Sequence, residues 1–202
     1  MSDVVADWPG SLDLGIAGAP HEGEERSGDL AVFVPTATGA LACVIDGLGH
    51  GPEAADAAAL CADVVRAHAE ADAQDLMQAC HEALVRTRGV VMTAAWFDLE
   101  AARLRWAGVG NVDARLVRQG PELREEVALV FGGVLGYRMP NVRPATMTLD
   151  RGDLLVMITD GIDAAISPAL AGGGAAQTLA DRIFAMHGKG TDDALVVVVR
   201  YR

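Results

Sequence analysis

The sequence predicts a single packed domain of the α/β or α+β class, and three observations indicate it. A chain of 202 residues is long enough for one well-buried core and short for two. Hydrophobic residues form 51% of it and aromatic residues only 4%, which suits a mixed packed domain rather than a disordered chain. The spacing of the apolar residues also alternates between strand and helix patterns. We therefore expect residues 1–202 to form one domain.

The first half of the chain predicts a strand hairpin followed by two helices. Short apolar runs bounded by glycine, proline and aspartate are typical of strands. Alanine- and leucine-rich segments with apolar residues at helical spacing are typical of helices. The expected strands are residues 12–18, 30–34 and 41–45, with a turn at 35–39, and the expected helices are 53–70 and 73–86.

The second half predicts mostly strands. From Gly89 the apolar residues return to strand spacing, and the last apolar run is almost continuously β-branched. We expect strands at 90–99, 104–109, 111–117, 127–131, 146–149, 154–158 and 194–200, a short helix at 162–166, a flexible loop at 169–174 and a helix at 175–187.

The chain is acidic, with a formal net charge of −12 and a pI of about 4.7. This charge disfavours nucleic acid and membranes as partners, because phosphate backbones and acidic lipids are themselves negative. No apolar run approaches the ~20 residues of a membrane span, and no signal peptide is recognised. We expect a soluble, cytoplasmic protein, with Cys43, Cys61 and Cys80 as reduced core residues.

One stretch, residues 40–59, combines a strand, a glycine-rich turn and a helix around Asp46. The apolar residues 41–45 end in Asp46, a turn with three glycines follows, and Pro52 then opens an alanine-rich helix. A carboxylate beside a buried strand is costly unless a positive group meets it. Asp46 is therefore the candidate centre of a metal site.

Further aspartates stand at the ends of other predicted strands. Asp29 opens the strand that pairs with the one ending in Asp46, so the hairpin brings these two residues side by side. Asp160 follows an apolar run and precedes glycine, as Asp46 does, and Asp192 and Asp193 precede the last strand. An aspartate in a turn is also ordinary turn chemistry, so only the positions taken together indicate a cluster.

Clustered carboxylates repel one another unless cations lie between them. Oxygen ligands without histidine or cysteine favour Mg²⁺ or Mn²⁺ over Zn²⁺. Two such ions about 3.5–4 Å apart can generate a hydroxide and orient a phosphate for attack. Gly47 suits this site because its carbonyl is presented without an intruding side chain.

These motifs together resemble the metal-dependent protein serine/threonine phosphatases of the PPM (type-2C) superfamily, in particular their SpoIIE-like bacterial branch. The resemblance covers the chain from about residue 12 to its end. The motifs are Asp46-Gly47-Leu48-Gly49-His50-Gly51 before an alanine-rich helix, Thr159-Asp160-Gly161 after an apolar strand, and Asp192-Asp193 before the last strand.

The resemblance implies an α+β fold, a four-layer α/β/β/α sandwich with two central, mainly antiparallel sheets. It implies two Mn²⁺ or Mg²⁺ ions, both bound by Asp46. One would also be held by Asp29 and the Gly47 carbonyl, and the other by Asp160 and Asp192, with Asp193 orienting a bound water. A metal-activated hydroxide would attack phosphoserine or phosphothreonine directly. The implied partners are phosphorylated STAS-domain or stressosome proteins, and we expect a monomer.

His50 lies in the glycine turn, where it is a candidate general acid for the leaving serine oxygen or simply a turn residue at the rim. The chain departs from its family in having Asp193-Ala194-Leu195 where a Thr or Ser commonly follows, and Arg26 is the only arginine near the N-terminus. The alternatives are a catalytically inactive phosphatase fold that serves as a binding module, a nucleotide-binding module and a metal-dependent hydrolase of another substrate, such as a nuclease. Asp46 and the glycine spacing disfavour the nucleotide-binding module, and the acidic charge disfavours the nuclease.

Overall fold

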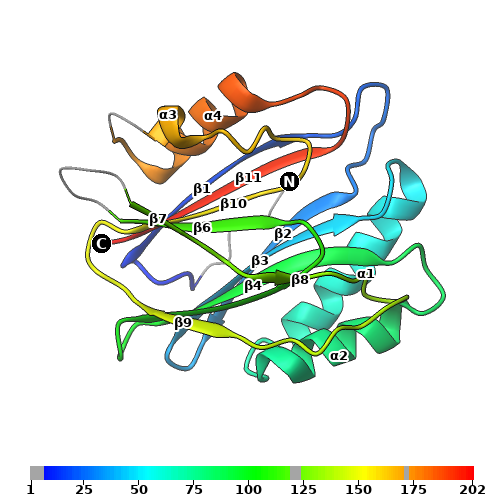
Figure 1. The fold of residues 1–202 in the computed structure, drawn as a ribbon, viewed down its shortest axis with the longest axis horizontal. Helices are drawn as coiled ribbons and strands as arrows, with labels where there is room; N and C mark the ends of the chain where they lie inside the picture. Colours follow the sequence, from blue (N-terminus) through cyan, green and yellow to red (C-terminus); the bar gives the residue numbers. More distant parts are fainter. Residues whose placement is uncertain (1–6, 119–123, 171–172) are drawn as a thin grey trace.

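The computed structural model describes residues 7–118, 124–170 and 173–202, in which two sheets face each other between helices (Figure 1). Sheet A contains, in spatial order, β1 (Leu12–Ala19), β11 (Ala194–Tyr201), β10 (Leu154–Ile158), β6 (Asp113–Arg118) and β7 (Arg124–Val127). Sheet B contains β2 (Asp29–Thr36), β3 (Gly39–Gly47), β4 (Val90–Asp98), β5 (Arg103–Val109) and β8 (Val130–Phe131), and β9 (Ala145–Thr148) also pairs with β5.

The helices cover the outer face of each sheet, which confirms the predicted four-layer α+β sandwich. In Figure 1, α3 (Ser167–Leu170) and α4 (Ala176–His187) lie above sheet A, and α1 (Pro52–Ala67) and α2 (Ala73–Leu84) lie below sheet B. The strand pairs are antiparallel except β5 with β8, which is parallel. None of the described helices is long and apolar enough to cross a membrane.

Side chains of β3 enter two different cores, which explains the unbroken apolar run at residues 41–45. Leu41, Cys43 and Ile45 pack between sheet B and the helices α1 and α2. Ala42 and Val44 pack between the two sheets. Successive side chains of a strand point to opposite faces, so a strand covered on both faces needs apolar residues at every position.

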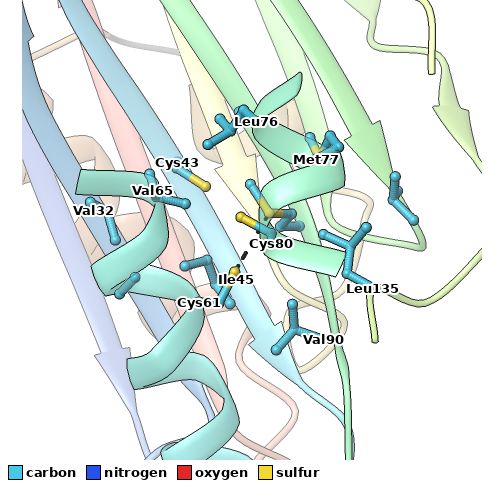
Figure 2. Packing of buried hydrophobic residues seen from close by; sticks show 14 of the residues in the cluster. Val32, Cys43, Ile45, Cys61, Val65, Leu76, Met77, Cys80, Val90 and Leu135 are labelled. Carbon is cyan, nitrogen blue, oxygen red and sulfur yellow. Dashed lines mark hydrogen bonds between the residues drawn. The ribbon is translucent and has the colours of Figure 1, made fainter. Parts of the chain in front are cut away.

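The three cysteines lie in the core between sheet B and the first two helices. Cys61 of α1 and Cys80 of α2 converge near β3, as Figure 2 shows, and all three thiols are free and buried. The Cys61 thiol donates to the sulfur of Met92 at 3.7 Å. Burial raises the pKa of Cys43, and hydrogen bonding to Cys80 together with burial raises the pKa of Cys61. These residues are therefore core residues, as predicted.

Two predicted elements differ from the structure. The single strand expected at residues 127–131 is divided between β7 in sheet A and β8 in sheet B, because the chain crosses from one sheet to the other there. The short helix expected at 162–166 is wrong: Ile162 forms a β-bridge with Gly188, and the Asp163 amide donates to the carbonyl of His187. Those backbone contacts take the place of helical hydrogen bonds. The helix α3 begins only at Ser167 and includes residues 169–170 of the loop predicted at 169–174. Residues 171–172 of that loop lie outside the described residues.

Candidate metal centre

The β2–β3 hairpin places Asp29 directly opposite Asp46. The two residues are register partners in an antiparallel pair that continues to Thr36 and Gly39 at the turn. Asp29 therefore comes from the first residue of one strand and Asp46 from near the end of the next, as the sequence indicates. Both lie at the same end of sheet B.

Asp160 and the Asp192-Asp193 pair lie at the neighbouring end of sheet A. β10 and β11 are antiparallel partners up to Ile158 and Val196, so the end of one strand and the start of the other share an edge. The approach is close: a Cβ added to Gly161 would lie 2.0 Å from the carbonyl oxygen of Asp193. This explains the glycine that follows Asp160.

Thr159 connects the acidic residues of the two sheets, and sequence reasoning assigned it no role. Its hydroxyl donates to the Asp29 carboxylate at 2.7 Å and accepts from the Leu195 amide at 2.9 Å. The side chain is almost fully buried. The sequence feature that could have indicated this role is the position of the threonine, directly before Asp160 at the end of an apolar strand.

Asp193 is buried, with 3% of its surface exposed, and its carboxylate holds the segment that precedes Asp29. One oxygen accepts from the His21 amide and the other from the Gly28 amide, each at 2.8 Å. A Cβ at Gly28 would lie 2.9 Å from Ala54 Cβ and 3.1 Å from Asp193 Oδ2. In this structure Asp193 thus positions the loop at 20–28, a role that differs from the expected orientation of bound water.

Asp160 and Asp192 are each held by a neighbouring group. The Asn111 side-chain amide donates to the Asp160 carboxylate at 3.0 Å, and the Asp193 amide donates to the Asp192 carboxylate at 2.9 Å. The Lys189 ammonium donates to the backbone carbonyl of Asp160, at 2.6 Å. Asn111 is a second site residue that sequence reasoning did not assign, although it follows Gly110 directly after β5.

Burial and mutual repulsion destabilise the ionised forms of Asp29 and Asp46. Burial, then the charge of Asp46 and to a lesser degree those of Asp193 and Asp160, raise the pKa of Asp29 from 3.8 to about 8, although the hydrogen bond from Thr159 lowers it. Burial, then the charges of Asp160, Asp192 and Asp193, raise the pKa of Asp46 from 3.8 to about 7. The largest causes of both shifts are burial and neighbouring carboxylates. Asp29 and Asp46 thus lie in a locally negative environment.

The chemistry of this cluster fits divalent cations. Carboxylate oxygens are the ligands that Mg²⁺ and Mn²⁺ prefer, and a bound cation would offset the repulsion that raises the pKa values of Asp29 and Asp46. Within residues 7–118, 124–170 and 173–202, no three acidic, histidine or cysteine side chains already converge on one ion position. We expect the carboxylates to draw together when cations bind, because ion binding removes their repulsion.

The glycine turn after Asp46 owes its composition to packing and backbone conformation. A Cβ at Gly47 would lie 2.3 Å from the carbonyl oxygen of Ala54, so α1 packs directly on this residue. Gly49 and Gly51 have φ of 82° and 81°, which favour glycine. His50 is exposed at the rim, with Nδ1 3.1 Å from a Glu24 oxygen and its ring stacked on His21 at 4.5 Å between centroids.

Comparisons with known proteins find relatives over most of the chain. Phosphoserine phosphatase RsbX of Bacillus subtilis (strain 168) is 27% identical over 143 residues, 70% of each chain. A chain in a structure described as "The bacterial stressosome: a modular system that has been adapted to control secondary messenger signaling" is 28% identical, with a TM-score of 0.85 over 94% of this chain and 99% of that one. RsbX in complex with magnesium has a TM-score of 0.84 at 21% identity, over 95% and 96% of the two chains.

The paired sheets have the fold of RsbX and of the type-2C phosphatase domain of SpoIIE from Bacillus subtilis, which has a TM-score of 0.77 at 22% identity, over 94% of this chain and 62% of that one. Residues 36–202 match the family model of Stage II sporulation protein E (SpoIIE). The chain belongs to the SpoIIE family, which confirms the resemblance seen in the sequence. Asp29 lies before the matched segment, so its place in the site depends on the hairpin register.

Proposed function

We propose that this protein removes phosphate from phosphoserine or phosphothreonine in regulatory proteins of a stressosome or STAS-domain signalling pathway, with two Mn²⁺ or Mg²⁺ ions as cofactors. Its similarity to a phosphoserine phosphatase and to a chain of a bacterial stressosome supports the substrate class. The magnesium complex of RsbX supports the choice of cofactor.

One observation carries the proposal: Asp29 and Asp46 are paired across a hairpin, and burial together with neighbouring carboxylates, Asp160 among them, raises the pKa values of both. Such an arrangement is unfavourable in a protein without ligands, because burial and like charges act in the same direction. A phosphate group is itself negative and does not compensate the carboxylates. Divalent cations compensate both the carboxylates and the phosphate.

Each residue of the cluster has a distinct role in the proposed reaction. Asp46 would contribute a ligand to both ions, Asp29 and the Gly47 carbonyl would help to hold one of them, and Asp160 and Asp192 would help to hold the other. Bound divalent ions activate water and neutralise the phosphate. The hydrogen bond from Thr159 orients the Asp29 carboxylate and favours its ionised form. The Asn111 side-chain amide orients the Asp160 carboxylate through its hydrogen bond.

The direct test measures phosphate release from p-nitrophenyl phosphate and from a phosphoserine protein, with Mn²⁺ or Mg²⁺ and with excess chelator. We expect hydrolysis with either ion, loss of activity in chelator and recovery when the ion is added back. Full activity in chelator would exclude the mechanism. Metal binding without hydrolysis of either substrate would instead support the inactive binding module.

His50 is proposed as the general acid that protonates the leaving serine oxygen, with Glu24 holding its ring. Para-nitrophenolate leaves without a proton donor, whereas a serine alkoxide needs one, so His50→Gln should act differently on the two substrates. We expect a decrease of about 10²-fold in kcat for a phosphoserine peptide and little change for p-nitrophenyl phosphate. Equal decreases for both would assign His50 to the structure of the turn, and no decrease would make it an ordinary rim residue.

A further inference from the structure

A groove of about 630 Å³ opens beside the carboxylate cluster, between the two sheets. Its lining includes Asp29, which also faces Asp46 in the candidate metal centre. The groove is therefore continuous with the site at which we propose that phosphate is released. A volume of this size is typical of sites that bind ligands.

Edge strands of both sheets form the walls of the groove. β1 is the outermost strand of sheet A and β2 is the outermost strand of sheet B. Residues 16–19 of β1 and 29–31 of β2 line the groove, together with Ala194 and Leu195 of β11. The edge of a strand presents backbone N–H and C=O groups to which an extended peptide can add.

Among the residues that the structure describes, α4 covers the first part of β1. The start of α4 packs on Gly15, where an added Cβ would lie 2.2 Å from the backbone of Ala176. The Gln177 side chain then occupies the edge at Ile16, accepting from its amide at 3.0 Å and donating to its carbonyl at 2.7 Å. Backbone groups of a strand alternate in direction, so Gly18 is the next residue facing this side, and it is exposed. The open part of β1 is thus the part nearest the cluster.

One face of α1 completes the groove and provides a positive end. Ala55 and Ala59 are one turn apart and leave room for a peptide backbone, and Arg66 lies further along the same helix. Arg26 also lines the groove, as does the acidic Glu25. Arg66 pairs with Asp63 at 3.0 Å on the exposed surface of α1. Such an exposed ion pair contributes only about 0–1 kcal/mol, so the guanidinium can turn toward another carboxylate.

We propose that the groove binds an extended segment of the phosphoprotein substrate, and that an acidic side chain of this segment meets Arg66. The inference rests on the proposed phosphatase function and adds the surface that selects the substrate. The helix rises about 16 Å between Ala55 and Arg66, which an extended chain spans in about five residues. Because the arginine side chain reaches back toward the start of α1, the acidic residue falls about three to five positions from the phosphoserine.

The proposed pairing of Arg66 with an acidic side chain is tested with phosphoserine peptides of about ten residues. Each peptide carries either glutamate or lysine, placed four residues before or four residues after the phosphoserine. We expect kcat/KM with Mn²⁺ to favour glutamate about tenfold, on one side of the phosphoserine only. Arg66→Glu should abolish this preference. Arg143→Glu, the same change at an exposed arginine outside the groove, should retain it.

The shape of the groove is tested with Ala59→Trp, which places a bulky side chain in the lining. The matched control is Leu60→Trp, the next residue of α1, which is exposed and outside the lining. We expect Ala59→Trp to lower kcat/KM for the preferred peptide about tenfold, mainly through KM, and to leave hydrolysis of p-nitrophenyl phosphate unchanged. Leu60→Trp should alter neither.

The proposal would be overturned if the wild type showed no preference for the glutamate peptide, or if Arg66→Glu left that preference unchanged. The proposal would also be overturned if Ala59→Trp lowered kcat/KM equally for the peptide and for p-nitrophenyl phosphate. Peptide affinity is also measured by fluorescence anisotropy, with Asp46→Asn introduced into the wild type and into each variant. If the Asp46→Asn proteins bind the glutamate peptide selectively, the groove is a peptide-binding site. If at the same time neither the wild type nor any variant hydrolyses phosphate, only the proposed function is contradicted.

Discussion

Asp46→Asn should abolish phosphatase activity, with a decrease of at least about 10³-fold in kcat for both aryl phosphate and phosphoserine peptide. Asp46 is the residue that we expect to bind both ions, and an amide supplies one neutral oxygen in place of two charged ones. The substitution removes no hydrophobic contact and no hydrogen bond described in the structure. Circular dichroism should therefore show a folded protein.

The matched control for this variant is Asp75→Asn, which makes the same chemical change at an exposed position in the first turn of α2. It should retain wild-type activity and metal affinity. Titration with Mn²⁺ followed by calorimetry separates loss of binding from loss of chemistry. Wild-type turnover by Asp46→Asn would remove Asp46 from the mechanism and with it the two-ion arrangement.

The same carboxylate should destabilise the metal-free protein at neutral and alkaline pH. The pKa of Asp46 is about 7 in the folded protein, against 3.8 for the ordinary group. The folded state therefore holds this proton more tightly than the unfolded state. Its stabilising contribution is complete below about pH 4 and is lost as the pH rises through 7. Asp29, with a pKa of about 8, acts in the same direction.

The measurement is urea unfolding of wild type and Asp46→Asn in chelator at about pH 5 and about pH 8. Between these values the free energy of unfolding of the wild type should fall by about 2–3 kcal/mol relative to that of the variant. Saturating Mn²⁺ should reverse the order of stability and make the wild type more stable than the variant, because ions that bind only the folded state stabilise it. Parallel pH dependences in the two proteins would show that Asp46 is not strained by its neighbours.

These two predictions describe one trade-off. A cluster of carboxylates that binds cations tightly is a cluster that repels itself without them. The structure contains the devices that hold it in place: Thr159 joins Asp29 to sheet A, and Asp193 fixes the loop before Asp29 through two backbone amides. The metal-free protein is expected to be less stable because its candidate ion ligands are already held close together.

The positions of the acidic residues could be predicted from the sequence because each depends on local structure. An apolar run followed by aspartate and glycine predicts a carboxylate at the end of a strand or just beyond it. Asp46 is the penultimate residue of β3, and Asp160 lies two residues after the end of β10. The hairpin then determines that Asp29 lies opposite Asp46, since antiparallel register follows from a short connection. The short helix expected at 162–166 is wrong for the converse reason. Its backbone groups bond to residues 187–188, far along the chain, and no local pattern reveals that contact.

The sequence by itself therefore determined most of the strands, the helices after Asp46 and the four acidic positions at strand ends. Only the tertiary structure decided which of these ends meet and what supports them. The hydroxyl of Thr159 reaches Asp29 across the two sheets, Asp193 binds the amides of His21 and Gly28, and the open ends of β1 and β2 border one groove. These contacts join residues far apart in the chain. Ordering these distant residues costs conformational entropy, and only the packing of both sheets offsets that cost. No local segment of the sequence therefore specifies these contacts.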